Sequence, residues 1–319
     1  TRLTEFYSHA FEFARNFYNT HTPQHAHWTG LELRSRSSAD TERQQKMLTR
    51  KLYPERILRD SENGLFMMKA GWLAPVAVVQ ALFQQVRAYR EKHGLPTYFS
   101  QNASLTDIAR VGTQWQLTST SETISVEHVV LCTGQSDIAL SEHEKLPIQP
   151  VRGQVTLVKP QQPVRLSHVI CQKGYALPPI NQILCTGATF ERGSSSAEIK
   201  FSDNESNLAQ INEMLGTSFS VEHLVGHRAS VRATTPDHLP IQGVLAREFM
   251  SGKKLVHKQG LTVLLGLGSR GFTSAPWLAH VNACSILGRV QPAGATLLQA
   301  TAADRFIKRK VVKAANRKG

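Results

Sequence analysis

Acidic residues are scarce in this chain, and their scarcity is most marked towards the C-terminus. Neither Asp nor Glu occurs between Glu248 and Asp304, although this stretch contains the pattern G-x-G-x-x-G at residues 266–271. In a βαβ nucleotide-binding unit, an acid about 20 residues after such a turn binds a ribose hydroxyl, and further strands complete the sheet. The acid is missing here, and too little chain follows Gly271 to build those strands. We therefore expect the turn to touch a cofactor, but not as the opening fingerprint of a nucleotide-binding unit.

Long apolar runs and paired cysteines are missing as well. No apolar run approaches the ~20 residues of a membrane span, and Thr1–Glu5 lacks a signal-peptide hydrophobic segment. The four cysteines have no C-x-x-C pair, which argues against a disulfide framework and a structural zinc site. We therefore expect a cytoplasmic protein without a metal or a membrane partner. Because the chain starts at Thr1 rather than Met, we also expect that upstream material is missing.

Positive charge is abundant. Lys and Arg number 37 against 24 Asp and Glu, which gives a formal net charge of +13. This excess favours a polyanionic partner, because each phosphate contacted by Lys or Arg frees condensed counterions. A solvated tail that only aids solubility explains the charge about as well. The excess of positive charge is greatest at the C-terminal end, where one acid, Asp304, is followed by seven basic residues: Arg305, Lys308, Arg309, Lys310, Lys313, Arg317 and Lys318.

Hydrophobic periodicity predicts helices and strands in alternation. Apolar residues at helical spacing predict an amphipathic helix over 3–18, whose aromatic stripe we interpret as core packing. A second helix follows G-W-L-A-P at 71–75 and ends at His93-Gly94. A strand over 97–99 and a hairpin around Gly112 come next. The apolar run 128–132 predicts a parallel strand that is covered on both faces.

The second half of the chain is predicted to be rich in β-structure. A β-rich segment runs from Val151 to about Phe190, and a helix covers 204–215. Residues 226–243 are dense in Arg, Thr and Pro and predict a loop-rich region, before a strand over 261–265. The order suggests a chain that alternates between two domains.

Six motifs, taken in order, resemble the D-amino-acid-oxidase superfamily of FAD enzymes. More narrowly, they resemble the oxidase part of the bifunctional tRNA 5-methylaminomethyl-2-thiouridine biosynthesis proteins, and the resemblance covers essentially the whole chain. The motifs are G-W-L-A-P at 71–75, V-L-C-T-G at 130–134, V-R-G-Q-V at 151–155, G-A-T-F-E-R-G at 187–193, V-R-A-T-T-P-D-H-L-P at 231–240 and L-G-S-R-G-F-T-S-A-P at 267–276.

The resemblance implies an α/β, D-amino-acid-oxidase-like fold in which an FAD-binding domain is interleaved with a β-rich substrate domain. The family's G-x-G-x-x-G turn and ribose-binding acid, which grip the FAD pyrophosphate, are expected before residue 1, so the fold is expected to be N-terminally truncated. The implied segments are 1–25 (helix of the FAD domain), 26–70 (substrate domain), 71–147 (FAD domain), 148–225 (substrate domain), 226–290 (FAD domain) and 291–319 (basic C-terminal tail).

The resemblance also implies a reaction on tRNA. FAD removes the carboxymethyl group from 5-carboxymethylaminomethyl-2-thiouridine at the wobble position, and glyoxylate and the aminomethyl nucleoside are the products. A methyltransferase domain of the full-length family protein then methylates the amine with S-adenosylmethionine. The expected partner is the tRNA anticodon loop, and we expect a monomer.

Site residues follow from the matched motifs. Thr133, Gly134 and the turn Gly268-Ser269-Arg270-Gly271 are expected to contact FAD. A planar guanidinium suits the substrate carboxylate, and Arg232 is the first choice, against an ion pair with Asp237; Arg152, Arg192 and Arg270 are weaker candidates. His238 is a candidate base for the substrate amine. The expected RNA contacts are Lys308, Arg309, Lys310 and Lys313, with support from Lys253, Lys254, His257 and Lys258.

Two other functions remain open from the residues. A small-molecule amine oxidase similar to glycine or sarcosine oxidase has the same fold, although the positive charge argues against it. A truncated, inactive RNA-binding remnant is the third possibility, because the motif that grips the pyrophosphate is not in the sequence.

Overall fold

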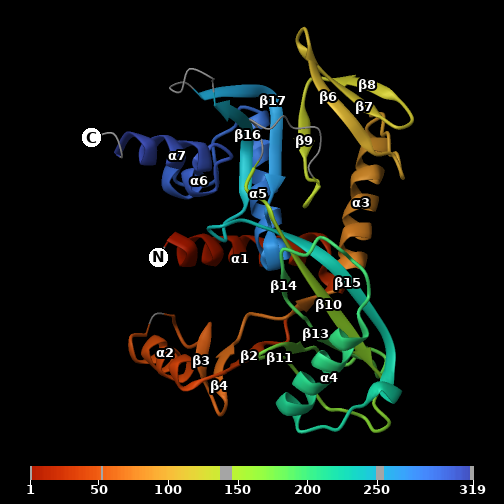
Figure 1. Cartoon of the computed structure of the whole chain (residues 1–319), viewed down its shortest axis with the longest axis vertical. Helices are drawn as coiled ribbons and strands as arrows, with labels where there is room; N and C mark the ends of the chain where they lie inside the picture. Colours follow the sequence, from red (N-terminus) through yellow and green to blue (C-terminus); the bar gives the residue numbers. More distant parts are fainter. Residues whose placement is uncertain (1, 52, 137–145, 249–254, 317–319) are drawn as a thin grey trace. The chain divides into compact units, whose positions relative to one another are not determined.

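The computed structural model describes residues 2–51, 53–136, 146–248 and 255–316, and in the last helix it describes side chains as far as Lys310. The chain divides into two compact units, each built from separated stretches (Figure 1). Unit 1 comprises 1–17, 90–151 and 232–319, and unit 2 comprises 18–89 and 152–231. Within the described ranges, no helix combines the length and apolar character needed to cross a membrane.

Unit 1 is organised around a sheet in the order β16-β17-β9. Strand β16 (Ile241–Glu248) is antiparallel to β17 (Leu255–Leu265), which is parallel to β9 (Val129–Leu131). A second, antiparallel sheet contains β6 (Leu105–Val111), β7 (Gln114–Ser119) and β8 (Thr123–Val126). The helices of this unit are α1 (Arg2–His21, which continues into unit 2), α5 (Gly271–Ile286), α6 (Ala295–Thr301) and α7 (Arg305–Asn316).

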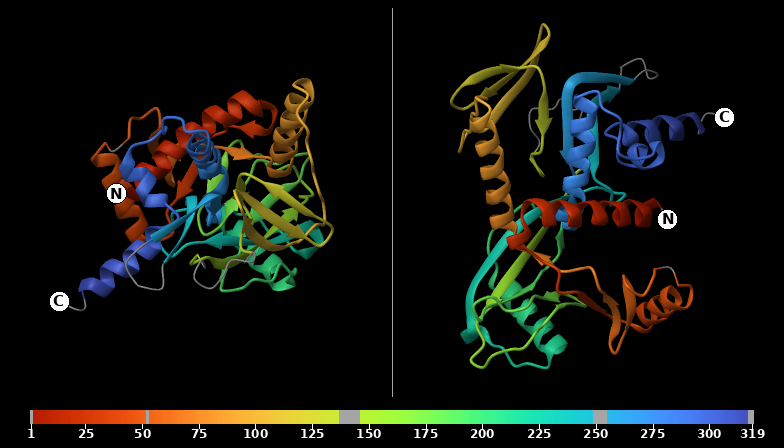
Figure 2. Two further views of the ribbon diagram at one scale, coloured as in Figure 1. Left: turned by 90° about the horizontal axis from the view of Figure 1, so that it is seen from above. Right: turned by 180° about the vertical axis from the view of Figure 1, so that it is seen from behind.

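Strand β17 lies at the centre of the core of unit 1, because side chains cover both of its faces. Leu261, Val263 and Leu265 point into one apolar cluster with β9, β16 and β7. Leu264 points the other way, into a cluster with Phe6 of α1 and Trp277 of α5. Figure 2 shows α5 running alongside this strand. The predicted helix over 3–18 is confirmed, and it buries Phe6, Ala10, Ala14 and Tyr18 at a four-residue spacing.

Two predictions for unit 1 are wrong. The segment 97–99 forms no strand, and Tyr98 is 93% exposed. Strand β9 is covered on one face only, because Val130 between its buried neighbours is 46% exposed. Both predictions fail for the same reason: a strand needs a neighbouring strand for its backbone hydrogen bonds, and its side chains are buried only where other residues pack on them. Among the described residues, no strand pairs with 97–99 or with the outer edge of β9.

Unit 2 contains a larger sheet in the order β14-β10-β13-β12-β11-β2-β4-β3, and β15 also pairs with β10, outside this order. Helix α4 (Phe201–Leu215) packs beside β13 and buries Leu208, Ile211 and Met214 (Figure 1). The strands are β2 (Leu31–Arg34), β3 (Leu58–Ser61), β4 (Gly64–Met67), β10 (Gln149–Val158), β11 (Val169–Cys171), β12 (Tyr175–Ala176), β13 (Leu184–Gly187), β14 (Glu191–Arg192) and β15 (Leu224–Thr234).

The remaining elements of unit 2 are short, apart from two helices. Helix α2 (Ser38–Thr49) is capped by the Ser37 side chain, which accepts a hydrogen bond from the Asp40 amide. Helix α3 (Pro75–Lys92) confirms the predicted helix after G-W-L-A-P, and its last residues belong to unit 1. A two-stranded ladder pairs β1 (Ala26–His27) with β5 (Trp72–Leu73).

Residues 226–243 were predicted to be loop-rich, and this prediction is wrong. They form most of β15 and the start of β16, joined by a turn over residues 235–240. Arg and Thr are compatible with strands whose side chains alternate between buried and exposed sides, so their density did not indicate a loop. The basic segment 291–319 is also structured in part, because α6 buries Leu297 and Ala300 in the core of unit 1.

A buried polar network joins β10 to α4 in unit 2. The Arg152 guanidinium is fully buried; it donates to the Glu198 carbonyl oxygen and to Gln154 Oε1 (3.0 Å) and forms an ion pair with Asp203. Gln154 Nε2 in turn donates to Asn204 Oδ1 at 3.0 Å. Arg152 therefore holds α4 on the sheet, and its role as a substrate-binding residue stays a prediction.

We expect Arg152→Met to lower the free energy of unfolding by about 3–5 kcal/mol, because removing one member of a buried ion pair leaves the other without a partner. Urea unfolding followed by circular dichroism measures the loss. The control is Arg192→Met, which removes an exposed arginine of the same unit and should change stability by less than about 0.5 kcal/mol. Equal losses for the two variants would contradict the role given to Arg152.

Candidate functional site

The parallel pairing of β9 with β17 brings the predicted cofactor motifs to one edge of a sheet. Val129 lies opposite Leu261 and Leu131 opposite Val263, so both strands end at the same edge. Thr133-Gly134 follows the first strand and Gly266–Gly271 follows the second. Ligands of α/β sheets bind beyond the carboxyl ends of parallel strands. The structure therefore brings together two segments that are about 130 residues apart in the chain.

Glycine is required at the start of the second turn. Gly266 has φ +66°, and a Cβ atom built on it would lie 2.5 Å from Thr235 Cγ2. A side chain at this position would be strained, and it would collide with Thr235, the first residue after β15. At Gly134, also with φ +66°, a Cβ would meet no atom of the described residues within 4 Å. The first turn is therefore open, and the second is held close against Thr235.

Helix α5 begins directly at the second turn. A short 3-10 turn over Gly268–Arg270 leads into Gly271, and Ser274 Oγ donates to the Arg270 carbonyl oxygen at 3.1 Å. The first turn of the helix contains no acidic residue. The first amides of a helix have no partner within the helix, and its dipole favours negative charge there. This end of α5 can stabilise an anionic group.

The turn between β15 and β16 is held by an ion pair. Arg305 of α7 forms two hydrogen bonds with Asp237, from Nε to Oδ2 (3.0 Å) and from Nη2 to Oδ1 (2.9 Å), and Arg309 Nη1 donates to Oδ2 at 2.6 Å. Partial burial raises the pKa of Asp237, but the hydrogen bonds and charge of Arg305 and the bond from Arg309 outweigh it and lower the pKa to about 2. An ion pair between Arg232 and this carboxylate, the alternative role predicted for Arg232, stays a prediction; Arg305 and Arg309 are partners of the carboxylate in the structure.

Arg232 lies on β15, two residues before Thr234. Thr234 Cγ2 is the atom nearest to a Cβ built on Gly268, at 3.6 Å, so this face of β15 approaches the second turn. Side chains two residues apart point to the same face of a strand. Arg232 is half-buried and lies on the face that approaches the turn, and its role as carboxylate partner stays a prediction.

The structure gives two other predicted site residues, His238 and Arg192, contacts that the sequence did not predict. His238 is exposed and has φ +59°, and its carbonyl oxygen accepts a hydrogen bond from Tyr7 (2.9 Å). Arg192 of unit 2 is exposed, with its guanidinium 5.9 Å from the centroid of the Phe190 ring. The contact between Tyr7 and His238 was not predicted, because an aromatic stripe on a helix indicates packing but not which polar atoms it meets.

The predicted RNA contacts lie on α7. Lys308 Nζ is 2.7 Å from Asp304 Oδ2, and Arg309 pairs with Asp237, yet both side chains are about half exposed. Lys310 is exposed. Ion pairs at a surface contribute about 0–1 kcal/mol, so these cations can exchange a carboxylate for a phosphate. The side chain of Lys313 and residues Lys253 and Lys254 lie outside the described part of the chain.

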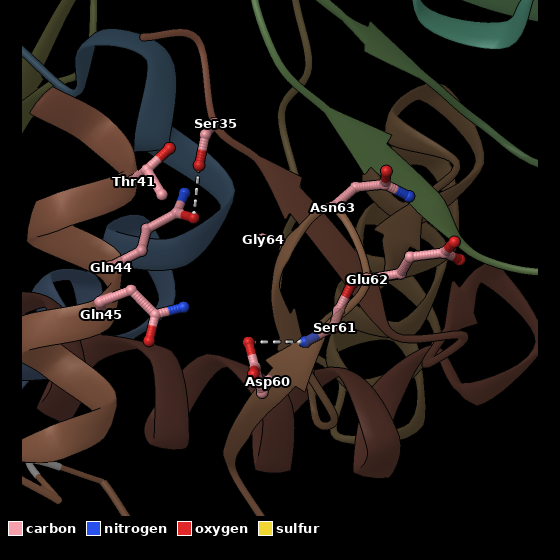
Figure 3. Close-up of a pocket in the computed structure, with 9 residues that line it drawn as sticks. All are labelled: Ser35, Thr41, Gln44, Gln45, Asp60, Ser61, Glu62, Asn63 and Gly64. Atoms are coloured by element: carbon pink, nitrogen blue, oxygen red, sulfur yellow. Dashed lines mark hydrogen bonds between the residues drawn. The ribbon is translucent and has the colours of Figure 1, made fainter. Parts of the chain in front are cut away.

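A polar pocket of about 580 Å³ lies elsewhere, in unit 2 (Figure 3). It is formed by α2 and the turn between β3 and β4, and no lysine or arginine lines it. None of the predicted site residues contributes to it, so it is not the predicted cofactor site. Its lining residues are Ser35, Thr41, Gln44, Gln45, Asp60, Ser61, Glu62, Asn63 and Gly64.

Comparison with known proteins identifies the family. The family model described as FAD dependent oxidoreductase (DAO) matches residues 3–284. The chain belongs to this family. FAD is therefore its cofactor, and the open turn after β9, the close turn after β17 and the acid-free start of α5 fit an anionic flavin.

Two curated relatives match nearly the whole chain. Both carry the name tRNA 5-methylaminomethyl-2-thiouridine biosynthesis bifunctional protein MnmC. The relative from Idiomarina loihiensis is 32% identical over 96% of this chain and 50% of its own length. The relative from Pseudoalteromonas atlantica is 31% identical over 96% of this chain and 51% of its own length. The chain thus spans about half the length of the curated relatives it matches.

Solved structures show the same fold. Glycine oxidase from Geobacillus kaustophilus has a TM-score of 0.73 at 17% identity and covers 92% of this chain and 81% of its own. L-proline dehydrogenase from P. horikoshii has a TM-score of 0.72 at 12% identity, with 94% and 83% covered. The chain therefore has the mixed α/β fold of D-amino-acid-oxidase-like FAD oxidases, as the sequence predicted.

We expect Gly266→Ala to destabilise the protein by more than the backbone strain of a positive φ alone would. Gly288 has a similar φ of +63° and no atom within 4 Å of a built Cβ, so Gly288→Ala should cost about 1–2 kcal/mol from the left-handed backbone. Gly266→Ala should cost about 1–3 kcal/mol more, because Thr235 must move. Thermal and urea unfolding give both values. Similar losses would show that the contact with Thr235 is not tight.

We expect Asp237 to make stability depend on pH in acid. Its folded pKa is lowered to about 2 from its ordinary value of 3.8, so its stabilisation is complete above about pH 5 and is lost as the pH falls towards 2. Allowing for partial exposure, the loss is about 1–2 kcal/mol. The measurement is the difference in unfolding free energy between wild type and Asp237→Asn, from pH 7 down to pH 2.

The difference should be constant near neutral pH and should narrow below about pH 4. Asp107→Asn is the matched control, because Asp107 is an exposed carboxylate on β6 of the same unit. A difference for Asp237→Asn that stays constant down to pH 2 would show that the Arg305 ion pair does not hold this carboxylate in its charged form.

Proposed function

We propose that this chain catalyses FAD-dependent oxidative removal of the carboxymethyl group from 5-carboxymethylaminomethyl-(2-thio)uridine at the tRNA wobble position. The observation that carries the proposal is its 32% identity, over 96% of its length, to a protein named for tRNA 5-methylaminomethyl-2-thiouridine biosynthesis. The expected products are the aminomethyl nucleoside and glyoxylate. We also propose that, in the full-length protein, a separate methyltransferase domain methylates the amine that this reaction produces.

The chemistry is the oxidation of a secondary amine next to a carboxylate. When bound, FAD would supply the oxidising power, as a two-electron acceptor for the CH2 group between nitrogen and carboxylate that an external acceptor such as dioxygen restores. The amine is thereby oxidised to an imine, and water then cleaves the C=N bond to give glyoxylate and the primary amine.

The residues of this chain supply binding and orientation. Thr133, Gly134, Gly268, Ser269, Arg270 and Gly271 would hold the cofactor, and the start of α5 would favour negative charge on it. Arg232 binds the substrate carboxylate through two parallel hydrogen bonds. His238 is the candidate that accepts the proton of the substrate amine.

The basic surface of α7 supports an RNA substrate. Lys308, Arg309 and Lys310 lie on one short helical stretch and are exposed. Phosphate contacts by such side chains give binding that weakens with salt, with a slope of roughly −0.7 per phosphate contact on a single strand. This observation favours tRNA over a free amino acid as the substrate.

We expect the purified chain supplied with FAD to release glyoxylate from tRNA that contains 5-carboxymethylaminomethyl-2-thiouridine. Mass spectrometry of the digested nucleosides should show the aminomethyl product. Arg232→Met should lower kcat/KM by about 100-fold or more, because a charged hydrogen-bonded pair to the substrate is lost. Arg228→Met is the matched control, since Arg228 lies on the same face of β15 but is exposed and belongs to unit 2.

Other outcomes point to other functions. Turnover of free glycine or sarcosine without turnover of tRNA would favour a small-molecule amine oxidase, in line with the structural similarity to glycine oxidase. A protein that binds tRNA in a salt-dependent way but that no added FAD makes active would favour an RNA-binding remnant. Binding to tRNA that does not change with salt would count against the RNA substrate.

A further inference from the structure

Arg270, in the turn that precedes α5, has an aromatic partner from a distant part of the chain. Its Cζ atom lies 4.6 Å from the centroid of the Tyr7 ring of α1. A guanidinium within about 6 Å of a ring face is attracted by the ring quadrupole. Arg270 is exposed, and an exposed arginine without such a partner samples many rotamers. The ring therefore limits where this positive charge can be.

The Tyr7 ring is itself held in place on two sides. It packs edge-to-face on Phe6, with 4.9 Å between centroids, and its hydroxyl donates to the His238 carbonyl oxygen at 2.9 Å. Burial raises the pKa of Tyr7 despite the opposing effect of the Arg270 charge. The phenol therefore stays neutral at working pH and remains a hydrogen-bond donor.

The backbone of Arg270 is fixed independently of its side chain. Its carbonyl oxygen accepts a hydrogen bond from Ser274 Oγ at 3.1 Å, and the residue directly precedes α5. The nearby carboxylate of Asp237 is already paired with Arg305 and Arg309. The start of α5 thus fixes the backbone position of Arg270, and the Tyr7 ring fixes where its guanidinium lies.

We propose that Tyr7 is a positioning residue that holds the Arg270 guanidinium at the second turn, where its charge adds to that of the start of α5 in binding the anionic cofactor. The inference rests on the proposed placement of FAD at this turn, and it does not depend on the identity of the substrate. The expected contribution to FAD affinity is the strength of a cation–π contact at an exposed site, about two- to fivefold.

The first test follows Arg270 in the cofactor-free protein. The Arg270 Nε–H resonance is assigned by its loss in Arg270→Lys, and its 15N relaxation reports the order of the side chain. We expect restricted motion in wild type, part of that restriction in Tyr7→Phe, which keeps the ring but loses the hydrogen bond between its hydroxyl and the Arg270 side chain, and free motion in Tyr7→Leu. Tyr98→Leu is the matched control, because Tyr98 is 93% exposed and belongs to the same unit.

The second test measures FAD affinity by fluorescence titration under conditions in which urea melts show every variant to be folded. We expect Tyr7→Leu and Arg270→Lys each to raise the dissociation constant about two- to fivefold. The double variant should be no weaker than Arg270→Lys alone, because Tyr7 acts through Arg270. Tyr98→Leu should bind like wild type.

Three results would overturn the inference. Unchanged Arg270 order in Tyr7→Leu would show that the ring does not hold the guanidinium. Multiplying losses in the double variant would show that the two residues act separately. If the wild-type protein does not bind FAD, the proposed binding of FAD at this turn is wrong. Failure to act on tRNA, with the expected order and affinity changes present, would count against the proposed function and leave the role of Tyr7 intact.

Discussion

The parallel pairing of β9 with β17 is the constraint on which the candidate site depends. Each strand is followed by a turn that contains glycine, and neither turn alone can form a binding site. The pairing brings Thr133-Gly134 and Gly266–Gly271 to the same edge of one sheet. Burial of β17 on both faces, in a cluster that includes Trp115 of β7 on one side and against α1 and α5 on the other, keeps that edge in place. A cofactor at this edge is therefore supported by the centre of the core.

Two polar contacts extend this support to the turn between β15 and β16. Asp237 joins that turn to α7 through Arg305, and Tyr7 joins it to α1 through the His238 carbonyl oxygen. Both contacts connect segments that are far apart in the chain, and both converge on a turn of six residues. The arrangement resembles the supporting shell that orients the groups of many active sites, in which residues that never meet the substrate fix those that do.

Local features of the fold could be predicted from the sequence, and long-range ones could not. The helix of Phe6 and the strand of Leu261 have clear periodicity or apolar runs, and glycines mark the turns. The strand predicted at 97–99 has suitable residues, but strand formation depends on a neighbour that composition does not reveal. Arg152 shows the same limit for sites: its residue type suits a carboxylate ligand, and only the structure shows that Asp203 and the Glu198 carbonyl already occupy it. Family motifs located Arg232 and Arg270, whereas the contact between Tyr7 and Arg270 has no local signal.

The interleaving of the two units also sets an order of assembly during synthesis. Unit 2 has all of its residues once the chain has reached residue 231, whereas unit 1 needs residues 232–319. Strand β9 must wait for β17, so the edge of the sheet that carries the candidate site closes only after unit 2 can already have folded. Because domains generally fold as they emerge and long-range pairings form slowly, we expect the β-rich unit to fold first and the edge with the two glycine turns to form last.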